Sequence, residues 1–339
     1  MRKDAKVRVP LTVQPNRAQR LPWFDNMNVS VSAVIPTRDR PEKLANLFAR
    51  LSSDGDPPKE VIVVDASADN RTQDLCARDR PAGCEVVYLR ASRSGAAEQR
   101  NEGVAKSSGS FILFADDDVV LAPDCVGTLL DALQADPGLG GVSALITNQQ
   151  YHPVGRISRI LYSWLNHGAL DDFSGRCIGP AVGFLPWDRP GRPKIEAVDW
   201  MPTTCAMYRR KALPDPPFDP FFKDYSLGED MAMSLVVARR WRLANARGAR
   251  AYHDRIKGEI KLGARRFAMI ELVGRHYIMV RVLGRSSAGD HARFAAYQLF
   301  MLLSLLRTPL GRRQFFLSLI GKLQAIPKAT ETLWRAGCY

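Results

Sequence analysis

Several features that mark other classes of protein are missing from this sequence. No run of 18 or more apolar residues occurs, although a helix that crosses a bilayer needs about 20. Residues 1–28 are basic and contain several prolines but no apolar stretch, so we expect an extension here and no secretory signal. The six cysteines form no Cys-x-x-Cys pair, which disfavours a zinc site or a disulfide framework and is typical of a reducing cytosol.

Common phosphate-binding motifs are missing as well. The glycine-containing segment at 95–103 is neither a Gly-x-Gly-x-x-Gly sequence nor a P-loop, so neither of these phosphate-binding loops is indicated.

The composition excludes a disordered chain, because 46% of the residues are hydrophobic and 24% are charged. The 339 residues are enough for one large domain or two.

The positive charge of the chain is concentrated in its last third. Residues 239–339 contain 20 Lys and Arg and 5 Asp and Glu, an excess of 15 positive charges. Residues 1–238 contain the other 28 basic and 30 acidic groups, so this part is nearly neutral. We therefore expect the two parts to face different partners.

Short apolar runs alternate with segments of helical spacing from position 29 onwards. We predict strands at 29–35, 61–64, 85–89, 111–114, 141–146 and 205–208, and edge strands at 243–246 and 249–252. We predict helices at 41–51, 67–80, 96–107, 123–136 and 228–240, and a further one near 157–165. This alternation is typical of a Rossmann-like α/β fold, with a mostly parallel sheet and helices on both faces. Ligands bind such sheets beyond the carboxyl ends of the strands.

Three regions follow from these patterns. They are an N-terminal extension at 1–28, an α/β domain at 29–258 and a basic amphipathic helical region at 259–339. Within the second region, residues 147–200 are rich in Gly, Pro, Trp and Arg, so we expect loops that face a substrate.

The helical region has the pattern of a membrane-surface segment. Residues 294–306 and 314–326 are apolar and lie beside arginines. Each run is shorter than the roughly 20 residues that cross a bilayer. Basic flanks and an apolar face favour helices that lie in the interface of an anionic membrane. An ordinary helical pair packed on the α/β domain is the alternative.

Acidic side chains follow the predicted strands. Asp116, Asp117 and Asp118 come directly after the strand at 111–114. Adjacent carboxylates repel one another, and a hard divalent cation relieves this repulsion. A solvated acidic loop is the alternative, but the position at the end of a strand favours a metal site. Asp65 also ends a strand, where it can accept a hydrogen bond from a ribose or a base, or cap the next helix.

Three further positions carry candidate chemistry. Arg100 lies on a predicted helix and can point its positive charge toward phosphates. The alternative is an ordinary surface arginine. Glu229 and Asp230 lie at the start of a predicted apolar helix. They either cap this helix, or one of them is a general base and the other holds it by hydrogen bonds. His253 follows a short strand and can bind a metal or a phosphate, although a single histidine is more often structural.

In combination, these motifs resemble the pattern of glycosyltransferase family 2, whose members have the GT-A fold. The resemblance covers about residues 30–255, with the motifs in the family's order. The motifs are Val-Ile-Pro-Thr-Arg-Asp-Arg at 34–40, Val-Val-Asp at 63–65, Arg-Asn-Glu-Gly at 100–103, Phe-Ala-Asp-Asp-Asp at 114–118, Gly-Glu-Asp at 228–230 and Tyr-His at 252–253. The resemblance implies an inverting, metal-dependent transferase that uses a nucleotide-diphospho-sugar.

The resemblance also implies roles on the donor side. Pro36, Thr37 and Asp39 match the loop that encloses the nucleotide, and Asp65 matches the carboxylate that recognises the base. Arg100 matches the cation near the nucleotide and its diphosphate.

Further matches concern the metal and the reaction. Asp116 and Asp118 match the two ends of the DxD motif: Asp116 faces the ribose side, and Asp118 holds Mn²⁺ or Mg²⁺ on the diphosphate. Asp117, between them, is a further candidate for binding the nucleotide sugar. His253 matches a late contact to the metal or the diphosphate, and Asp230 matches the catalytic base.

The acceptor side matches the family less closely. Trp200, Thr204 and Glu229 are the acceptor-contact candidates, but the segment at 200–207 lacks the glycine that the family usually has there. Arg-Trp at 240–241 lacks the glutamine of the motif found in processive synthases, so we expect transfer of a single sugar. The family implies a glycan or lipid-linked acceptor in cell-surface assembly. We expect a cytoplasmic enzyme that is peripheral on the inner face of the cell membrane.

Two other classes of function are weighed against the transferase. A nucleic-acid-binding protein would use the basic last third, but aromatic platforms and a recognisable module are missing and the arginines alternate with apolar runs. No nucleic-acid partner is therefore expected. A GT-A-like scaffold without catalysis is disfavoured because Asp116, Asp118 and Asp230 are all present.

Overall fold

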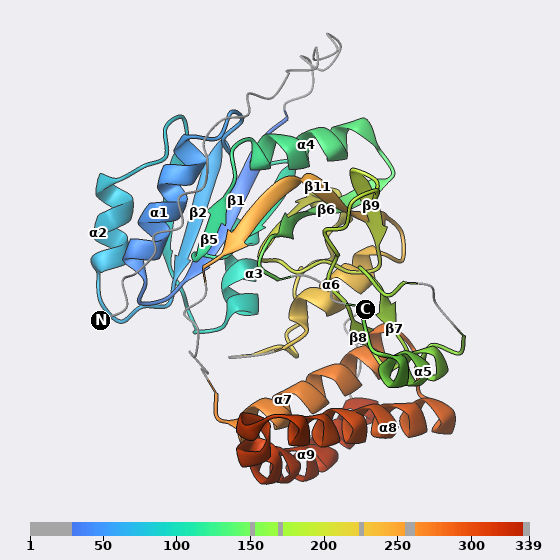
Figure 1. Cartoon of the computed structure of the whole chain (residues 1–339). Helices are drawn as coiled ribbons and strands as arrows, with labels where there is room; N and C mark the ends of the chain where they lie inside the picture. Colours follow the sequence, from blue (N-terminus) through green and yellow to red (C-terminus); the bar gives the residue numbers. More distant parts are fainter. Residues whose placement is uncertain (1–28, 150–152, 169–171, 224–226, 255–261, 335–339) are drawn as a thin grey trace, which may run out of the picture.

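The computed structural model describes residues 29–149, 153–168, 172–223, 227–254 and 262–334. The predicted extension at 1–28 lies outside these residues. A twisted sheet with helices on its two faces forms the upper part of the molecule in Figure 1, and the helices of residues 262–334 form a layer below it.

The central sheet contains strands that lie between positions 31 and 253 of the chain. Within the described residues these are β1 (Val31–Thr37), β2 (Glu60–Asp65), β3 (Glu85–Arg90), β4 (Phe111–Ala115), β5 (Val119–Leu121), β6 (Leu139–Ile146), β9 (Ile195–Val198), β10 (Cys205–Arg209) and β11 (Arg242–His253). Their order is β3-β2-β1-β4-β10-β6-β11-β5, with β9 also paired to β11. Strands β3, β2, β1, β4, β6 and β11 run in one direction, and β10, β9 and β5 run in the other. The prediction of a mostly parallel sheet is confirmed.

Helices connect and cover these strands. They are α1 (Pro41–Ser52), α2 (Arg71–Arg78), α3 (Ala96–Lys106), α4 (Cys125–Ala135), α5 (Arg156–Leu165), α6 (Glu229–Val237), α7 (Ala264–Tyr277), α8 (Ala288–Ser304) and α9 (Pro309–Trp334). Short helical turns lie at Arg210–Ala212, Ile278–Val282 and Leu305–Arg307. A two-stranded hairpin, β7 (Cys177–Ile178) with β8 (Val182–Gly183), lies apart from the main sheet.

The alternation of side chains along the strands produces two cores, one on each face of the sheet. In β1, Ala33 and Ile35 belong to the core that α1 and α4 cover, and Val34 belongs to the core that α3 and α6 cover. On α1, Leu44 and Leu47 are buried as their spacing predicts. The prediction of helices on both faces is therefore confirmed.

The last strand of the sheet differs from the prediction. The expected edge strands at 243–246 and 249–252 are one continuous strand, β11, in the interior of the sheet. β11 pairs with β6 before and after an irregularity between Ala246 and Arg250, and with β9 and β5 on its other side. A bulge adds residues to one strand without ending its pairing. The prediction of two separate edge strands is therefore wrong.

Two boundaries near the carboxyl ends of strands also differ. Helix α2 begins at Arg71, not at position 67, because the Asp65 carboxylate accepts the Ser67 N–H and the Asp69 carboxylate accepts the Arg71 N–H. Such side-chain turns compete with a helix. Strand β1 continues through Pro36 to its end, because pairing with β4 has already stopped there and a missing N–H costs nothing on that side.

The region at 147–200 contains more regular structure than the expected loops. Helix α5 lies where a helix was predicted near 157–165, and β7, β8 and β9 follow it. β9 pairs antiparallel with the first half of β11 and so joins this region to the main sheet.

The helices after position 262 form a layer that is hydrogen-bonded to the sheet-bearing part. Arg275 donates to the carbonyl of Ala181, Arg285 donates to the carbonyl of Gly179, and the Tyr277 hydroxyl donates to Asp219. Within the layer, α7, α8 and α9 share a small apolar core. Among the described helices, none combines the length and the apolar character needed to cross a membrane.

Candidate active site

Polar side chains meet at one edge of the sheet, beyond the carboxyl ends of its parallel strands. Thr37 ends β1, Asp65 ends β2, and Asp116 directly follows β4. His253 ends β11, which runs in the same direction as these strands. The edge at which a ligand site is expected in an α/β sheet therefore contains four of the predicted residues.

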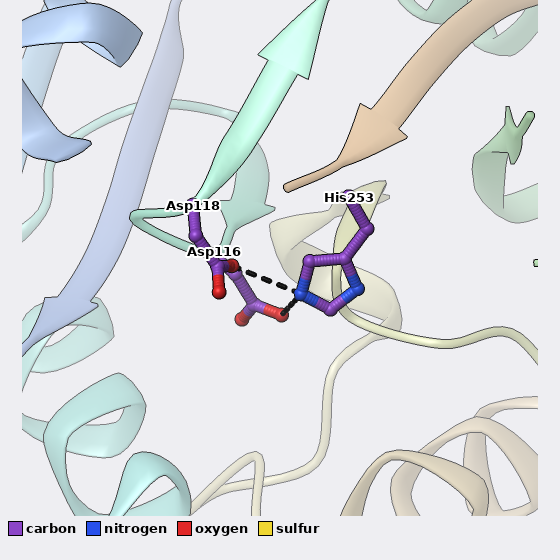
Figure 2. Close-up of side chains that lie close together, drawn as sticks. All are labelled: Asp116, Asp118 and His253. Atoms are coloured by element: carbon purple, nitrogen blue, oxygen red, sulfur yellow. Dashed lines mark ion pairs between the residues drawn. The ribbon is translucent and has the colours of Figure 1, made fainter. Parts of the chain in front are cut away.

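Asp116, Asp118 and His253 form a compact group of possible metal ligands. One ligand atom from each residue lies within 4.8 Å of the other two. Figure 2 shows the two carboxylates turned toward the imidazole, whose Nε2 lies 2.9 Å from Asp118 Oδ1 and 3.9 Å from Asp116 Oδ2. Two carboxylates and one imidazole are a donor set that divalent cations such as Mn²⁺ accept.

The orientation of the His253 ring is fixed by residues just after β6. Gln149 Nε2 lies 2.9 Å from His253 Nδ1, and Asn148 exchanges hydrogen bonds with the His253 backbone, at 2.8 Å and 3.0 Å. When a ring nitrogen binds a metal, the other nitrogen usually donates its proton to a fixed partner. The Gln149 amide can be that partner through its oxygen, because the amide oxygen and nitrogen exchange places on a half-turn of the side chain. These residues therefore fit a metal ligand at Nε2.

Asp117 and Arg40 complete the acidic segment. The Thr37 hydroxyl donates to Asp117 Oδ2 at 2.7 Å. Arg40 lies 3.4 Å from Asp117 and 3.1 Å from Asp118. Burial raises the pKa of the Asp117 carboxyl to about 6, against the opposing effects of Thr37 and Arg40. Sequence reasoning missed Arg40, although it is the last residue of the motif at 34–40.

Arg100 connects the acidic segment with the start of α6. Its Nη2 lies 2.6 Å from Asp116 Oδ1, and its Nη1 lies 3.9 Å from Glu229 Oε1. Arg100 is buried, and its guanidinium also lies over the ring of Phe218, 5.6 Å from the centroid. Among the described residues, its Nε and Nη1 have no hydrogen-bond acceptor. The buried cation can therefore donate to a further anionic group.

Glu229 and Asp230 form the first turn of α6. The chain enters this helix through Gly228, whose φ of 96° favours glycine. Asp230 accepts the N–H of Met231 at 2.7 Å. Burial raises the pKa of Glu229 to about 7, and repulsion from Asp230 adds to this effect. Burial also raises the pKa of Asp230, although Arg100 opposes it.

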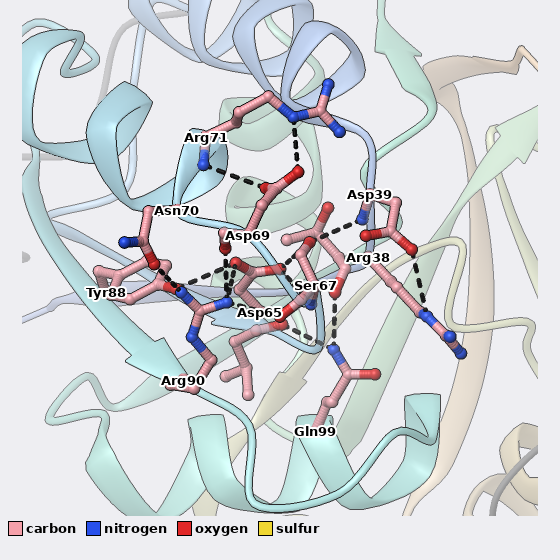
Figure 3. Close-up of polar contacts among 12 residues, drawn as sticks. Arg38, Asp39, Asp65, Ser67, Asp69, Asn70, Arg71, Tyr88, Arg90 and Gln99 are labelled. Atoms are coloured by element: carbon pink, nitrogen blue, oxygen red, sulfur yellow. Dashed lines mark hydrogen bonds and ion pairs between the residues drawn. The ribbon is translucent and has the colours of Figure 1, made fainter.

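Asp65 belongs to a second polar cluster on the same edge, shown in Figure 3. Its carboxylate is fully buried and accepts hydrogen bonds from Ser67 N, at 2.9 Å, and from the Tyr88 hydroxyl, at 3.0 Å. Arg90 Nη1 lies 3.4 Å from the same carboxylate. Sequence reasoning missed Tyr88 and Arg90, because only the fold places β3 beside the end of β2. It also missed Ser67, although this residue lies only two positions after Asp65.

The segment that contains the other nucleotide-loop candidates contacts both clusters, through Thr37 and Asp39. Asp39 is exposed, has a φ of 56° and donates its N–H to the Ser67 hydroxyl at 2.7 Å. The Gln99 side chain stabilises this loop by donating a hydrogen bond to the Thr37 carbonyl at 3.0 Å. Pro36 is buried inside β1, opposite Val64.

The two remaining acceptor candidates lie in different surroundings. The Thr204 carbonyl accepts the Asp116 N–H at 3.1 Å, so the Thr204 backbone lies next to the acidic segment. Trp200 is buried beside β8: a Cβ added to Gly183 would lie 2.8 Å from its ring. In the part of the chain that the structure describes, the indole N–H of Trp200 has no hydrogen-bond partner. The fold therefore joins Thr204, but not Trp200, to the acidic segment through a hydrogen bond.

Known proteins with similar sequences are glycosyltransferases. The profile of the family described as Glycosyl transferase family 2 matches residues 32–215. A curated protein from Haemophilus influenzae, named an uncharacterized glycosyltransferase, is 27% identical over 123 residues, which are 36% of this chain. The chain spans 38% of the length of that relative.

Solved structures of similar architecture share the GT-A fold. A mannosyltransferase from Pyrobaculum calidifontis, in complex with GDP-Man and Mn²⁺, has a TM-score of 0.53 at 16% identity, over 91% of this chain and 88% of that one. Mannosyl-3-phosphoglycerate synthase from Rubrobacter xylanophilus has a TM-score of 0.50 at 17% identity, over 77% of each chain. At these identities the likeness shows the fold alone. The family profile extends from β1 to just beyond β10, more than half of the sequence, and the chain therefore belongs to glycosyl transferase family 2.

Proposed function

We propose that this protein is an inverting, metal-dependent glycosyltransferase that moves one sugar from a nucleotide-diphospho-sugar to an acceptor hydroxyl. The observation that carries the proposal is the meeting of Asp116, Asp118 and His253 at one edge of the sheet, with Arg100 joining them to Glu229. The mannosyltransferase of the same fold that is bound to GDP-Man and Mn²⁺ supports this donor class.

In this proposal, Asp118 and His253 hold Mn²⁺ or Mg²⁺, and Asp116 lies beside them. A bound divalent ion supplies positive charge that stabilises the diphosphate as it leaves the sugar. The imidazole nitrogen favours Mn²⁺ over Mg²⁺, because Mg²⁺ prefers oxygen ligands.

The donor lies across the carboxyl ends of β1, β2 and β4. Arg100 directs its unpartnered N–H groups toward the diphosphate, and Asp117 helps to hold the nucleotide sugar. Pro36, Thr37 and Asp39 enclose the nucleotide. Asp65 receives a hydrogen bond from the base, in a cluster that Ser67 and Tyr88 already hold in place.

Asp230 acts as the general base of the reaction. Its carboxylate takes the proton of the acceptor hydroxyl while the hydroxyl oxygen forms a bond to the anomeric carbon. The bond from that carbon to the diphosphate oxygen breaks on the opposite face, so one displacement inverts the configuration. A positioned base contributes a factor on the order of 10²–10⁴ to the rate, and burial strengthens this base by raising its pKa.

The acceptor is a glycan or a lipid-linked sugar, contacted by Trp200, Thr204 and Glu229. We place the enzyme in cell-surface polysaccharide or glycoconjugate assembly, at the inner face of an anionic membrane. The apolar and basic helices of residues 262–334 support this location. The proposal keeps the sheet-bearing part as the catalytic domain and these helices as the membrane-facing region.

The proposal is tested by release of nucleoside diphosphate from UDP-, GDP- and dTDP-sugars, with Mn²⁺ or Mg²⁺ and a panel of glycan and lipid-linked acceptors. We expect metal-dependent release with one base class. Asp230→Asn should lower the rate at least 100-fold, whereas Glu42→Gln, at an exposed position of α1, should not. NMR of the product gives its anomeric configuration. Wild-type silence with every donor would favour a scaffold without catalysis, and retained configuration would contradict the single displacement.

A further inference from the structure

Two neighbouring helices expose apolar faces that no described part of the chain covers. The residues are Leu299, Leu303 and Leu306 from α8 and the turn after it, and Phe316, Ile320 and Leu323 from α9. Within each group the spacing is three and four residues, which places the side chains on one side of a helix. Phe316 is 71% exposed, although a buried position is usual for such a side chain.

Helix α5 adds a third apolar face at one end of this layer. Ile157 and Ile160 are 70% and 72% exposed, and Trp164 is 47% exposed. The helix is attached to α8: Arg293 Nε donates to the Trp164 carbonyl at 3.3 Å, and its guanidinium lies 5.4 Å from the centre of the Trp164 ring. Figure 1 shows α5 beside α8, at the lower right of the molecule. Apolar side chains are therefore exposed on neighbouring helices from two distant parts of the sequence.

The charge around these faces is strongly positive. Residues 262–334 contain 11 Lys and Arg and 3 Asp and Glu. One of the three acids, Glu271, is already paired with Arg275 and Lys322. Apolar helical faces with basic neighbours are typical of segments that lie at the surface of an anionic membrane.

An open cavity with basic walls lies next to the apolar face of α9. It has a volume of about 710 Å³ and is lined by Arg265, Arg266, Met269, Gln324 and Lys328, among others. Arg265 is held by Gln324, whose side-chain oxygen accepts from Nε at 2.7 Å. Over the described ranges, none of the three cations is paired with a carboxylate. Pro327 of the cavity wall lies four residues after Leu323 of the exposed face, so the two are neighbours on the surface of α9.

We propose that this cavity binds the phosphate of an anionic phospholipid headgroup, while the exposed faces of α5, α8 and α9 enter the lipid layer beside it. The three cations supply charge and N–H donors for phosphate oxygens, and the apolar side chains leave water for acyl chains. The inference rests on the proposed membrane location of the transferase, but not on its donor or its chemistry. It makes Arg265, Arg266 and Lys328 the groups that select an anionic surface.

The test is flotation of the full chain with phosphatidylcholine vesicles and with vesicles that also contain phosphatidylglycerol. One triple variant, Arg265→Gln, Arg266→Gln and Lys328→Gln, removes the cavity cations. A matched control, Arg50→Gln, Lys59→Gln and Arg80→Gln, removes three exposed cations from the sheet-bearing part. A third variant, Phe316→Ser, Ile320→Ser and Leu323→Ser, changes the apolar face of α9.

We expect the wild type to bind phosphatidylglycerol vesicles, and the cavity variant to bind them on the order of 100-fold more weakly, because each lost cation weakens binding about fivefold. The control should lose less than about threefold, since its cations lie outside the interface. The α9 variant should also lose binding to the phosphatidylglycerol vesicles, because its apolar side chains can no longer enter the lipid layer. Circular dichroism and thermal unfolding of each variant separate these effects from misfolding.

If the cavity variant and the control lose vesicle binding to the same extent, the headgroup site is wrong. Binding would then come from the overall positive charge of the chain. Failure of the wild type to bind any vesicle would overturn the membrane location as well, while nucleoside diphosphate release in solution would still test the transferase. A dimer that dissociates in the α9 variant, seen by sedimentation equilibrium, would show that a second copy covers the apolar face and would also overturn the inference.

Discussion

The guanidinium of Arg100 and the carboxylate of Asp116 form a close ion pair, with Nη2 2.6 Å from Oδ1. Arg100 comes from α3, and Asp116 follows β4. The other terminal nitrogen of Arg100 lies 3.9 Å from Glu229, next to the proposed base. One buried cation therefore holds together the metal side and the acceptor side of the proposed site.

Removal of this cation should affect both stability and donor binding. Arg100→Met leaves Asp116 and Glu229 without their buried partner, so we expect a loss of about 3–5 kcal/mol in the free energy of unfolding. Arg100→Lys keeps the charge but cannot reach both carboxylates as a planar fork does. It should retain most of the stability and raise KM for the donor. Urea unfolding and donor kinetics measure the two effects, and an unchanged KM in Arg100→Lys would contradict the proposed diphosphate contact.

Gln149 should influence metal binding although it is not a proposed ligand. Its side chain lies 2.9 Å from His253 Nδ1 and can fix which ring nitrogen carries the proton. Loss of such a partner usually lowers metal affinity about 10–100-fold. We expect Gln149→Ala to weaken Mn²⁺ binding by this factor, as measured by titration calorimetry. Gln73→Ala, at an exposed position of α2, should leave Mn²⁺ binding unchanged. Equal affinities of Gln149→Ala and the wild type would argue against ligation through Nε2.

Glu229 should make the fold less stable as the pH rises. Its pKa is about 7 in the folded chain and near the ordinary 4.5 when unfolded. Between these values the folded state holds a proton that the unfolded state has released, so stability falls as the pH rises and the full penalty is present above pH 7. Glu229→Gln removes this penalty. The Tm advantage of the variant over the wild type should therefore be small near pH 4 and reach at least about 2–4 °C at pH 8. A constant difference across this range would contradict the raised pKa.

Asp65 should control which nucleotide base the donor carries. Its buried carboxylate is held by Ser67 and Tyr88, so its position is fixed before a donor binds. Asp65→Asn replaces a hydrogen-bond acceptor by a donor at one edge, which should change the ratio of kcat/KM between UDP- and GDP-sugars about tenfold or more. Asp74→Asn, at an exposed position of α2, should leave this ratio of kcat/KM values unchanged. Loss of stability without a change in this ratio would assign Asp65 a structural role.

The sequence was sufficient to predict the fold class and the edge of the sheet on which the acids meet. Apolar runs of strand length ended at Asp65 and just before Asp116, and parallel strands bring such ends to one side. His253 was included only through the resemblance to glycosyltransferase family 2, because a single histidine after a short strand is more often structural. The other predictions needed only the local pattern and the direction of the strands.

The contacts that orient these groups could not be read from the chain. Arg40 reaches Asp118, and Gln149 reaches His253, only because β1 and β6 lie in particular places in the sheet. The continuity of β11 was missed because its irregular middle lacks the period of a strand. For α8 and α9, the sequence indicated apolar and basic helices, but only the packing shows which apolar residues are covered.

The proposed mechanism depends most directly on a divalent ion held by Asp118 and His253. Electron paramagnetic resonance of Mn²⁺ during titration of the purified chain measures this binding without any donor or acceptor. We expect one tight site in the wild type, retained in Glu42→Gln and weakened at least 100-fold in the double variant Asp118→Ala and His253→Ala. If the double variant binds Mn²⁺ as tightly as the wild type, or the wild type binds none, the proposed metal site and the mechanism built on it are wrong.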